Sequence, residues 1–148
     1  MTLTGIDHLG LTVADLDRAT RWYCETLGFE RSLGYRNAAI GADVEILVHP
    51  DLGDLRVSLR RYDDTARDPF SEFATGLDHV AFGVADGDQL ARWQTRLEAA
   101  GVPSTRTDLV ELSILAFRDP DNIQLELCTP IQERPGGSSI DESGRLAP

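Results

Sequence analysis

The chain has 148 residues, of which 41% are hydrophobic and 26% are charged, and its formal net charge at pH 7 is −11. So acidic a composition argues against nucleic acids and anionic membranes as partners, because both are bound through basic patches. Two cysteines are too few for a secreted disulfide framework, and no apolar run approaches the ~20 residues of a membrane-spanning helix. We expect a globular, cytoplasmic protein without a signal peptide.

An internal repeat organises the chain. Residues 4–8 (Thr-Gly-Ile-Asp-His) align with residues 75–79 (Thr-Gly-Leu-Asp-His), and at the same offset Arg21-Trp22 aligns with Arg92-Trp93. Such self-similarity indicates two copies of one supersecondary unit, each about half of the chain.

The first module covers about residues 3–62. Apolar and other side chains alternate over residues 6–13, which predicts a half-buried strand. A helix follows, with Asp15 or Asp17 as its N-cap and Gly28 as its end. Three more strands are predicted, over residues 29–36, 43–48 and 55–62.

The second module, about residues 75–130, repeats this order after a polar link near residues 63–74. Its predicted elements are a strand over residues 77–84, a helix from about Asp88 to Gly101, and strands over residues 104–110, 112–118 and 123–129. The fold class is α+β: two tandem βαβββ modules form a cupped mixed sheet with helices on its outer face. We expect one domain over residues 1–130 and a flexible tail over residues 131–148.

Three potential metal ligands fall on the helix-free side of the predicted strands. His8 alternates with the apolar residues of the first strand, His79 occupies the same place in the second module, and Glu126 lies on that side of the last strand. Two imidazoles and a carboxylate are a common ligand set for a divalent metal. A single strand histidine is more often structural and a single glutamate more often solvated, but repetition of the histidine favours the metal site.

Four segments resemble the vicinal oxygen chelate superfamily, which includes glyoxalase I, bleomycin-resistance proteins, extradiol dioxygenases, methylmalonyl-CoA epimerase and fosfomycin-resistance enzymes. The segments are residues 5–8, 22–29, 77–82 and 119–127. The resemblance implies a cupped sheet around one metal ion, with ligands on the first and last strands of each module. Carried over, these ligands are His8, His79 and Glu126. The resemblance also implies a homodimer, because short members complete the cup by pairing.

A fourth family ligand position falls on Ser58, whose hydroxyl is a poor metal ligand. Ser58 either holds a metal-bound water or leaves room for substrate. Arg56 and Arg60 would share its face and bind a carboxylate or phosphate; alternatively they reach solvent or pair with surface carboxylates. His49 and Glu45 are candidates for a base, if both face the cup.

The resemblance leaves several functions open. Lyase or isomerase chemistry through a metal-stabilised enolate, on a small, anionic, oxygen-chelating substrate, is the leading hypothesis. The first alternative is ring cleavage by an Fe(II) extradiol-dioxygenase-like protein, but Ala116 replaces the signature tyrosine and no histidine lies between His79 and Glu126. Fosfomycin-resistance enzymes have a threonine- and tyrosine-containing segment before the second histidine, and residues 74–78 lack it. The second alternative is a non-catalytic drug- or metabolite-binding protein. The expected cofactor is one divalent ion of Fe, Mn, Zn, Ni or Co.

Overall fold

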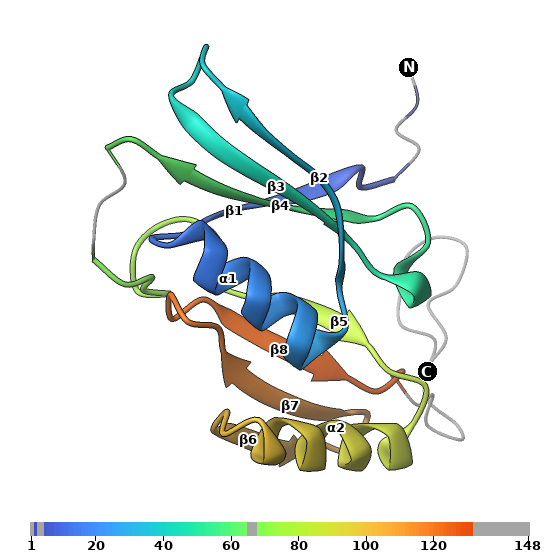
Figure 1. Cartoon of the computed structure of the whole chain (residues 1–148). Coiled ribbons are helices and arrows are strands. Elements are labelled where there is room, and N and C mark those ends of the chain that lie inside the picture. Colours follow the sequence, from blue (N-terminus) through green and yellow to red (C-terminus); the bar gives the residue numbers. More distant parts are fainter. Residues whose placement is uncertain (1, 3–4, 65–67, 132–148) are drawn as a thin grey trace.

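The computed structural model describes residue 2, residues 5–64 and residues 68–131, whose strands form two four-stranded mixed sheets (Figure 1). Each sheet belongs to one module, which confirms the predicted α+β fold of two tandem βαβββ units. No helix among these residues is long and apolar enough to cross a membrane. The predicted tail lies outside the described part of the chain from residue 132 onward.

The first module contains one sheet with the strand order β1-β4-β3-β2. Its elements are β1 (His8–Thr12), α1 (Leu16–Trp22), β2 (Glu30–Asn37), β3 (Ala42–Val48) and β4 (Arg56–Tyr62). β1 and β4 pair in parallel, while the other pairs are antiparallel. A π-helical turn (Tyr23–Leu27) prolongs α1, and Gly28 ends it with a φ of 87°, a left-handed conformation that favours glycine.

The second module repeats this topology with the strand order β5-β8-β7-β6. Its elements are β5 (Val80–Gly83), α2 (Gly87–Ala99), β6 (Ser104–Asp108), β7 (Ser113–Arg118) and β8 (Gln124–Cys128). The N-caps are also repeated: Asp15 accepts a hydrogen bond from the backbone of Arg18 at 2.9 Å, and Asp86 accepts one from Gln89 at 2.8 Å. These carboxylates satisfy amide groups that have no partner within the helix.

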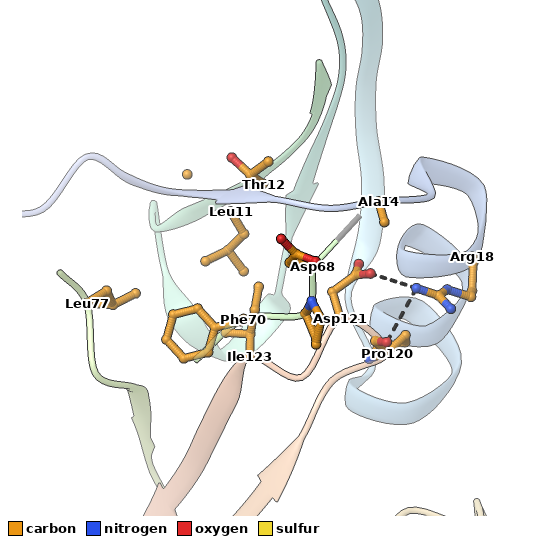
Figure 2. Close-up of a pocket in the computed structure, with 12 residues that line it drawn as sticks. Leu11, Thr12, Ala14, Arg18, Asp68, Phe70, Leu77, Pro120, Asp121 and Ile123 are labelled. Atoms are coloured by element: carbon orange, nitrogen blue, oxygen red, sulfur yellow. Dashed lines mark hydrogen bonds and ion pairs between the residues drawn. The ribbon is translucent and has the colours of Figure 1, made fainter. Parts of the chain in front are cut away.

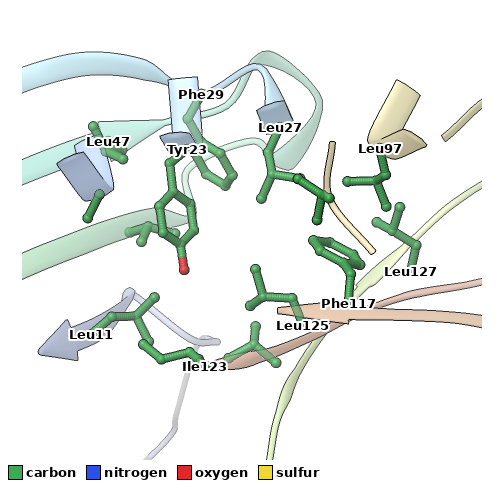
Figure 3. Packing of buried hydrophobic residues seen from close by; sticks show 14 of the residues in the cluster. Leu11, Tyr23, Leu27, Phe29, Leu47, Leu97, Phe117, Ile123, Leu125 and Leu127 are labelled. Atoms are coloured by element: carbon green, nitrogen blue, oxygen red, sulfur yellow. The ribbon is translucent and has the colours of Figure 1, made fainter. Parts of the chain in front are cut away.

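The two modules share one hydrophobic core. Figure 1 shows α1 between the two sheets, and Figure 3 shows side chains of both modules meeting there. Trp22 packs against Phe117 with ring centroids 6.4 Å apart, and Phe29 packs against Phe82 at 6.1 Å. Because each sheet turns its apolar face to this core, the two helix-free faces lie on opposite sides of it.

Polar contacts join the modules where α1 meets the turn before β8. Arg18 donates through Nη2 to Asp121 Oδ1 at 2.6 Å and to the Pro120 carbonyl at 3.3 Å, beside a cleft of about 720 Å³ (Figure 2). Neither His8 nor His79 lines this cleft. The cleft is therefore a seam between modules and not part of the predicted metal site.

Candidate metal centre

The helix-free face of the first sheet carries His8 at the start of β1. In the register of the sheet, His8 lies beside Arg56 and Gly10 lies beside Ser58. Because strand side chains alternate, His8, Ser58 and Arg60 share one surface, which we call the module-1 cup face. Together with Arg56 they line a pocket of about 490 Å³.

The helix-free face of the second sheet carries the other two predicted ligands. His79 immediately precedes β5, and Glu126 lies beside Ala81 in the parallel β5–β8 pair. His79, Glu126 and Cys128 form the module-2 cup face. The registers also confirm the predicted correspondence of Ser58 with Glu126. Ser58 pairs with Gly10, two residues after His8, and Glu126 pairs with Ala81, two residues after His79.

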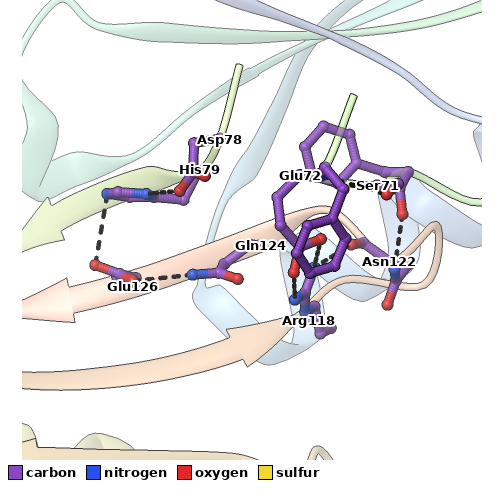
Figure 4. A network of polar contacts seen from close by, with 10 residues as sticks. Ser71, Glu72, Asp78, His79, Arg118, Asn122, Gln124 and Glu126 are labelled. Atoms are coloured by element: carbon purple, nitrogen blue, oxygen red, sulfur yellow. Dashed lines mark hydrogen bonds and ion pairs between the residues drawn. The ribbon is translucent and has the colours of Figure 1, made fainter. Parts of the chain in front are cut away.

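The His79–Glu126 pair has the spacing of two ligands of one metal ion. His79 Nε2 lies 3.6 Å from Glu126 Oε2 (Figure 4). Metal bonds of about 2.0–2.2 Å place neighbouring donor atoms roughly 3 to 3.5 Å apart, so a small adjustment would let both bind one ion. Gln124 donates to the other carboxylate oxygen, Oε1, at 3.1 Å and thereby orients Glu126. The donor set and its spacing fit a divalent cation.

Both cup histidines are anchored by the aspartate that precedes them. His8 Nδ1 lies 2.8 Å from Asp7 Oδ2, and His79 Nδ1 lies 2.6 Å from Asp78 Oδ1. The hydrogen bond to Asp78 raises the pKa of His79. Burial opposes this rise, and the charge of Glu126 adds to it. The hydrogen bond to His8 and the charge of Arg56 lower the pKa of Asp7. Each imidazole thus keeps Nε2 available for another partner.

The three predicted ligands do not meet within one chain. His8 lies on the first sheet and His79 with Glu126 on the second, and the shared core separates the two cup faces. Over residues 5–64 and 68–131, no group of three His, Cys, Asp or Glu side chains is placed to hold one metal ion. A single chain therefore brings together two of the three predicted ligands.

The two predicted anion-binding arginines differ in their partners. The Arg56 guanidinium makes an ion pair with Asp7, the residue that also contacts His8. Arg60 donates through Nε to the Ser58 hydroxyl at 3.1 Å, and within the described chain no carboxylate pairs with it. Ser58 is only 1% exposed, so the hydroxyl that accepts this hydrogen bond is buried below the guanidinium of Arg60. Arg60 thus remains available to an anion in the pocket.

The expectation that Glu45 and His49 face the cup is wrong. Glu45 is opposite Leu59 on the core side of the sheet, where it accepts hydrogen bonds from Arg31 at 3.1 and 2.7 Å. His49 packs against the Phe29 ring on the same side. The error arises because alternation in β3 points to the wrong face: Val44 and Ile46 lie opposite Arg60 and Ser58 on the cup side, while Glu45 shares the core side with Leu47.

The anchoring residues Asp7 and Asp78 were missed by the sequence analysis, as was Gln124. The signal for the two aspartates is present in the repeat, since each stands one residue before its histidine. No comparable pattern marks Gln124, whose contact with Glu126 follows from the alternation of β8.

Comparison with known proteins identifies the family. The model of the Glyoxalase/Bleomycin resistance protein/Dioxygenase superfamily matches residues 5–127. The chain belongs to this superfamily. Among superfamily relatives, "Glutathione transferase FosA" of Serratia marcescens is 32% identical over 125 residues, which cover 84% of this chain and 80% of the relative.

Solved structures show the same superfamily fold. A glyoxylase/bleomycin resistance protein/dioxygenase domain from Frankia sp. EAN1pec is 38% identical, has a TM-score of 0.79, and is matched over 87% of this chain and 99% of its own. FosX, a fosfomycin resistance protein of Listeria monocytogenes, was solved as a mutant with Mn(II) and 1S,2S-dihydroxypropylphosphonic acid. It is 19% identical with a TM-score of 0.65, over 85% of this chain and 92% of its own, and shows the fold alone.

Proposed function

We propose that this chain is a divalent-metal-dependent enzyme whose metal site is completed across a homodimer. The observation that carries the proposal is the His79–Glu126 pair, with Nε2 and Oε2 3.6 Å apart, on one cup face and the repeat-related His8 on the other. In a homodimer, His8 of one protomer would join His79 and Glu126 of the partner subunit. Two-fold symmetry then produces two identical sites.

The sheet edges support this assembly. In the part of the chain that the structure describes, β1 and β5 are each the end strand of a sheet, so each leaves one edge unpaired. His8 lies at the start of β1 and His79 immediately precedes β5. Bringing β1 of one chain beside β5 of another would cover two open edges and bring the two histidines together.

The proposed ligand set suits several metals and one general kind of chemistry. Two imidazoles and one carboxylate accept Fe, Mn, Zn, Ni or Co. A bound divalent ion would supply Lewis-acid stabilisation to an enolate or related oxyanion of the substrate. Lyase or isomerase chemistry of this type is our leading proposal, with Fe(II)-dependent ring cleavage and non-catalytic binding as alternatives. Similarity to "Glutathione transferase FosA" adds transfer of glutathione as an outcome to test.

The module-1 cup face provides the proposed substrate contacts. Arg60, supported by Ser58, presents the guanidinium that no described carboxylate neutralises, while Arg56 is held by Asp7 at the rim of the same pocket. In a protein of net charge −11, a cation left free in a concave site favours a carboxylate, phosphate or phosphonate ligand.

Metal analysis tests the proposed site. The purified protein should bind about one divalent ion per chain, measured by elemental analysis after dialysis, and His79→Ala should lose it. Retention of metal by His79→Ala would contradict the ligand assignment. Failure of the native protein to bind Fe, Mn, Ni or Zn after their addition would contradict the proposed function and favour a binding protein.

Subunit complementation tests the cross-chain assembly. Differently tagged His8→Ala and His79→Ala chains should each fail to bind metal alone, whereas their purified heterodimer should contain about one site per two chains. The reciprocal control pairs a native chain with the double variant His8→Ala/His79→Ala, and this heterodimer should bind no metal. Sites within single chains would give the opposite results for the two heterodimers.

Substrate assays separate the reaction classes. Oxygen consumption with catechols would support ring cleavage, and glutathione consumption with fosfomycin would support group transfer. Incorporation of solvent deuterium next to the carbonyl of small oxo or hydroxy acids would support the enolate chemistry. Loss of the observed activity in His79→Ala is required in every case.

A further inference from the structure

We propose that Asp7 and Asp78 are positioning residues that hold His8 and His79 in one tautomer, with the lone pair of Nε2 available to the metal. This inference rests on the proposed function, because it assigns the means by which that site gains its affinity. Its basis is a contact that both modules repeat: the preceding aspartate lies 2.8 Å from Nδ1 of His8 and 2.6 Å from Nδ1 of His79.

The chemistry of imidazole explains the consequence of this contact. A neutral imidazole has one N–H donor and one lone pair, and an ionised carboxylate can only accept. An aspartate at Nδ1 therefore keeps the proton on Nδ1 and the lone pair on Nε2. Carboxylates that bind the outer nitrogen of a metal-binding histidine orient its ring and increase its basicity, and their removal weakens metal binding.

The third histidine of the chain has the opposite arrangement. His49 Nδ1 accepts a hydrogen bond from the backbone N–H of Asp51 at 3.1 Å, and its Nε2 lies 3.2 Å from the carbonyl of Leu27. Because a carbonyl can only accept, His49 carries its proton on Nε2. Its lone pair is already occupied at Nδ1, which leaves no nitrogen for a metal. The Nδ1–H form is thus confined to the two histidines of the cup faces.

The backbone before each aspartate is also repeated. Gly5 and Gly76, two residues before the aspartates, have φ values of 142° and 158°, which side-chain-bearing residues rarely adopt. A Cβ at either position would meet nothing within 4 Å, so the glycines serve backbone conformation and not close packing. The repeated Gly-x-Asp-His sequence thus corresponds to a local structure that brings each aspartate to its histidine.

The two pairs differ in the charge that surrounds them. Asp7 shares its carboxylate between His8 and the Arg56 guanidinium, whereas Asp78 has no ion pair with an arginine in the described chain. Gln124 occupies the strand position in β8 that corresponds to Arg56 in β4. Because no described arginine shares the Asp78 carboxylate, its hydrogen bond to His79 should be stronger than that of Asp7 to His8.

The first readout is the tautomer of each histidine in the metal-free protein. Long-range ¹H–¹⁵N correlation spectra at pH 8 should show the Nδ1–H form for His8 and the Nε2–H form for His49. For His79 the same form as His8 is expected once Glu126→Ala has removed the second carboxylate, which lies 3.6 Å from its Nε2, and this background is used for the Asp78 variants. Asp78→Ala should shift only the His79 signals towards the Nε2–H form, which is the commoner one in water. Asp78→Asn retains an acceptor oxygen and should preserve the native signals. An Nε2–H form for His79 in Glu126→Ala, with Asp78 intact, would overturn the inference.

The second readout is the dissociation constant of the intact dimer for Mn(II) and Zn(II), measured by titration calorimetry. We expect Asp78→Ala to weaken binding about 10- to 100-fold and Asp7→Ala to weaken it less. Asp51→Ala is the matched control: it removes an equal charge beside His49 and should leave the constant unchanged. If Asp7→Ala and Asp78→Ala both bind metal with native affinity, this inference is overturned and the proposed function is not. Absence of metal binding by the native protein would overturn the proposed function, and the tautomer spectra would still decide whether the aspartates position the rings.

Discussion

At the scale of single residues, Arg60 differs from the neighbouring arginines of β4 in its partners. It is supported by the buried Ser58 hydroxyl and has no carboxylate partner among the described residues, unlike Arg56, which is paired with Asp7. The adjacent Arg61 contacts Asp43 through its guanidinium, at 3.4 Å. Three arginines of one strand thus differ in the charge still available to a ligand.

Arg60→Gln should weaken the binding of a small anion to the metal-loaded protein about 10-fold or more, because a charge-assisted hydrogen bond contributes about 1.5–3 kcal/mol. NMR titration with glycolate and with methylphosphonate measures the effect and ranks carboxylate against phosphonate. Arg61→Gln, which removes an equal charge from the same strand, should leave both affinities unchanged. Equal weakening in the two variants would indicate general electrostatic attraction instead.

At the scale of elements, the end of α1 is tied to the second module through one buried hydrogen bond. The Tyr23 hydroxyl donates to Asp119 Oδ2 at 3.1 Å, while Asp119 Oδ1 accepts from the backbone of Asp121 and Ile123. Burial, reinforced by the Asp119 charge, raises the pKa of Tyr23 well above its ordinary value. The folded protein therefore favours the neutral phenol.

Tyr23→Phe should lower the free energy of unfolding by about 1–3 kcal/mol at neutral pH, because it leaves Asp119 Oδ2 without this donor. The raised pKa gives the native protein stability that is fully present below the unfolded-state pKa of about 10 and is lost as the pH rises above it. Tyr23→Phe should lack this alkaline loss. Urea titrations at pH 7 and pH 11 measure both effects, and Tyr35→Phe, on an exposed tyrosine, is the control that should reproduce the native values.

The elements also show why some sites are predictable from sequence. In β1 and β8 one face is apolar and the other is not, so alternation places His8 and Glu126 correctly on the helix-free side. In β3 the apolar residues Val44 and Ile46 lie on the cup side, so the same reasoning placed Glu45 on the wrong face. The repeat defines each module, but it does not say how two apolar faces pair. The separation of His8 from His79 therefore emerges only from the three-dimensional structure.

At the scale of the whole molecule, a shared core joins the two modules, and we expect them to unfold as one cooperative unit. Aromatic side chains of both modules pack across the seam, and Arg96 of α2 donates to the carbonyls of Thr26 and Glu25 at 2.7 and 3.0 Å. Buried residues of both sheets and both helices belong to one hydrophobic cluster. Unfolding of one module should therefore remove the support of the other.

Single-tryptophan variants test this cooperativity, because Trp22 belongs to the first module and Trp93 to the second. Trp93→Phe leaves a fluorescence probe of module 1, and Trp22→Phe leaves one of module 2. Adding Leu125→Ala, a buried residue of β8, to each should lower stability by about 2–5 kcal/mol and shift both transitions together. Separate midpoints for the two probes would show that the modules unfold independently.

The placement of the cup faces on opposite sides of one core has a consequence for regulation by mass action. If each metal ion draws its ligands from two chains, the ion binds the dimer and not the monomer, so metal and subunit association stabilise each other. Dilution would then release metal without any change in its free concentration, and added metal would tighten the dimer. The amount of protein present would itself determine how much of it carries metal.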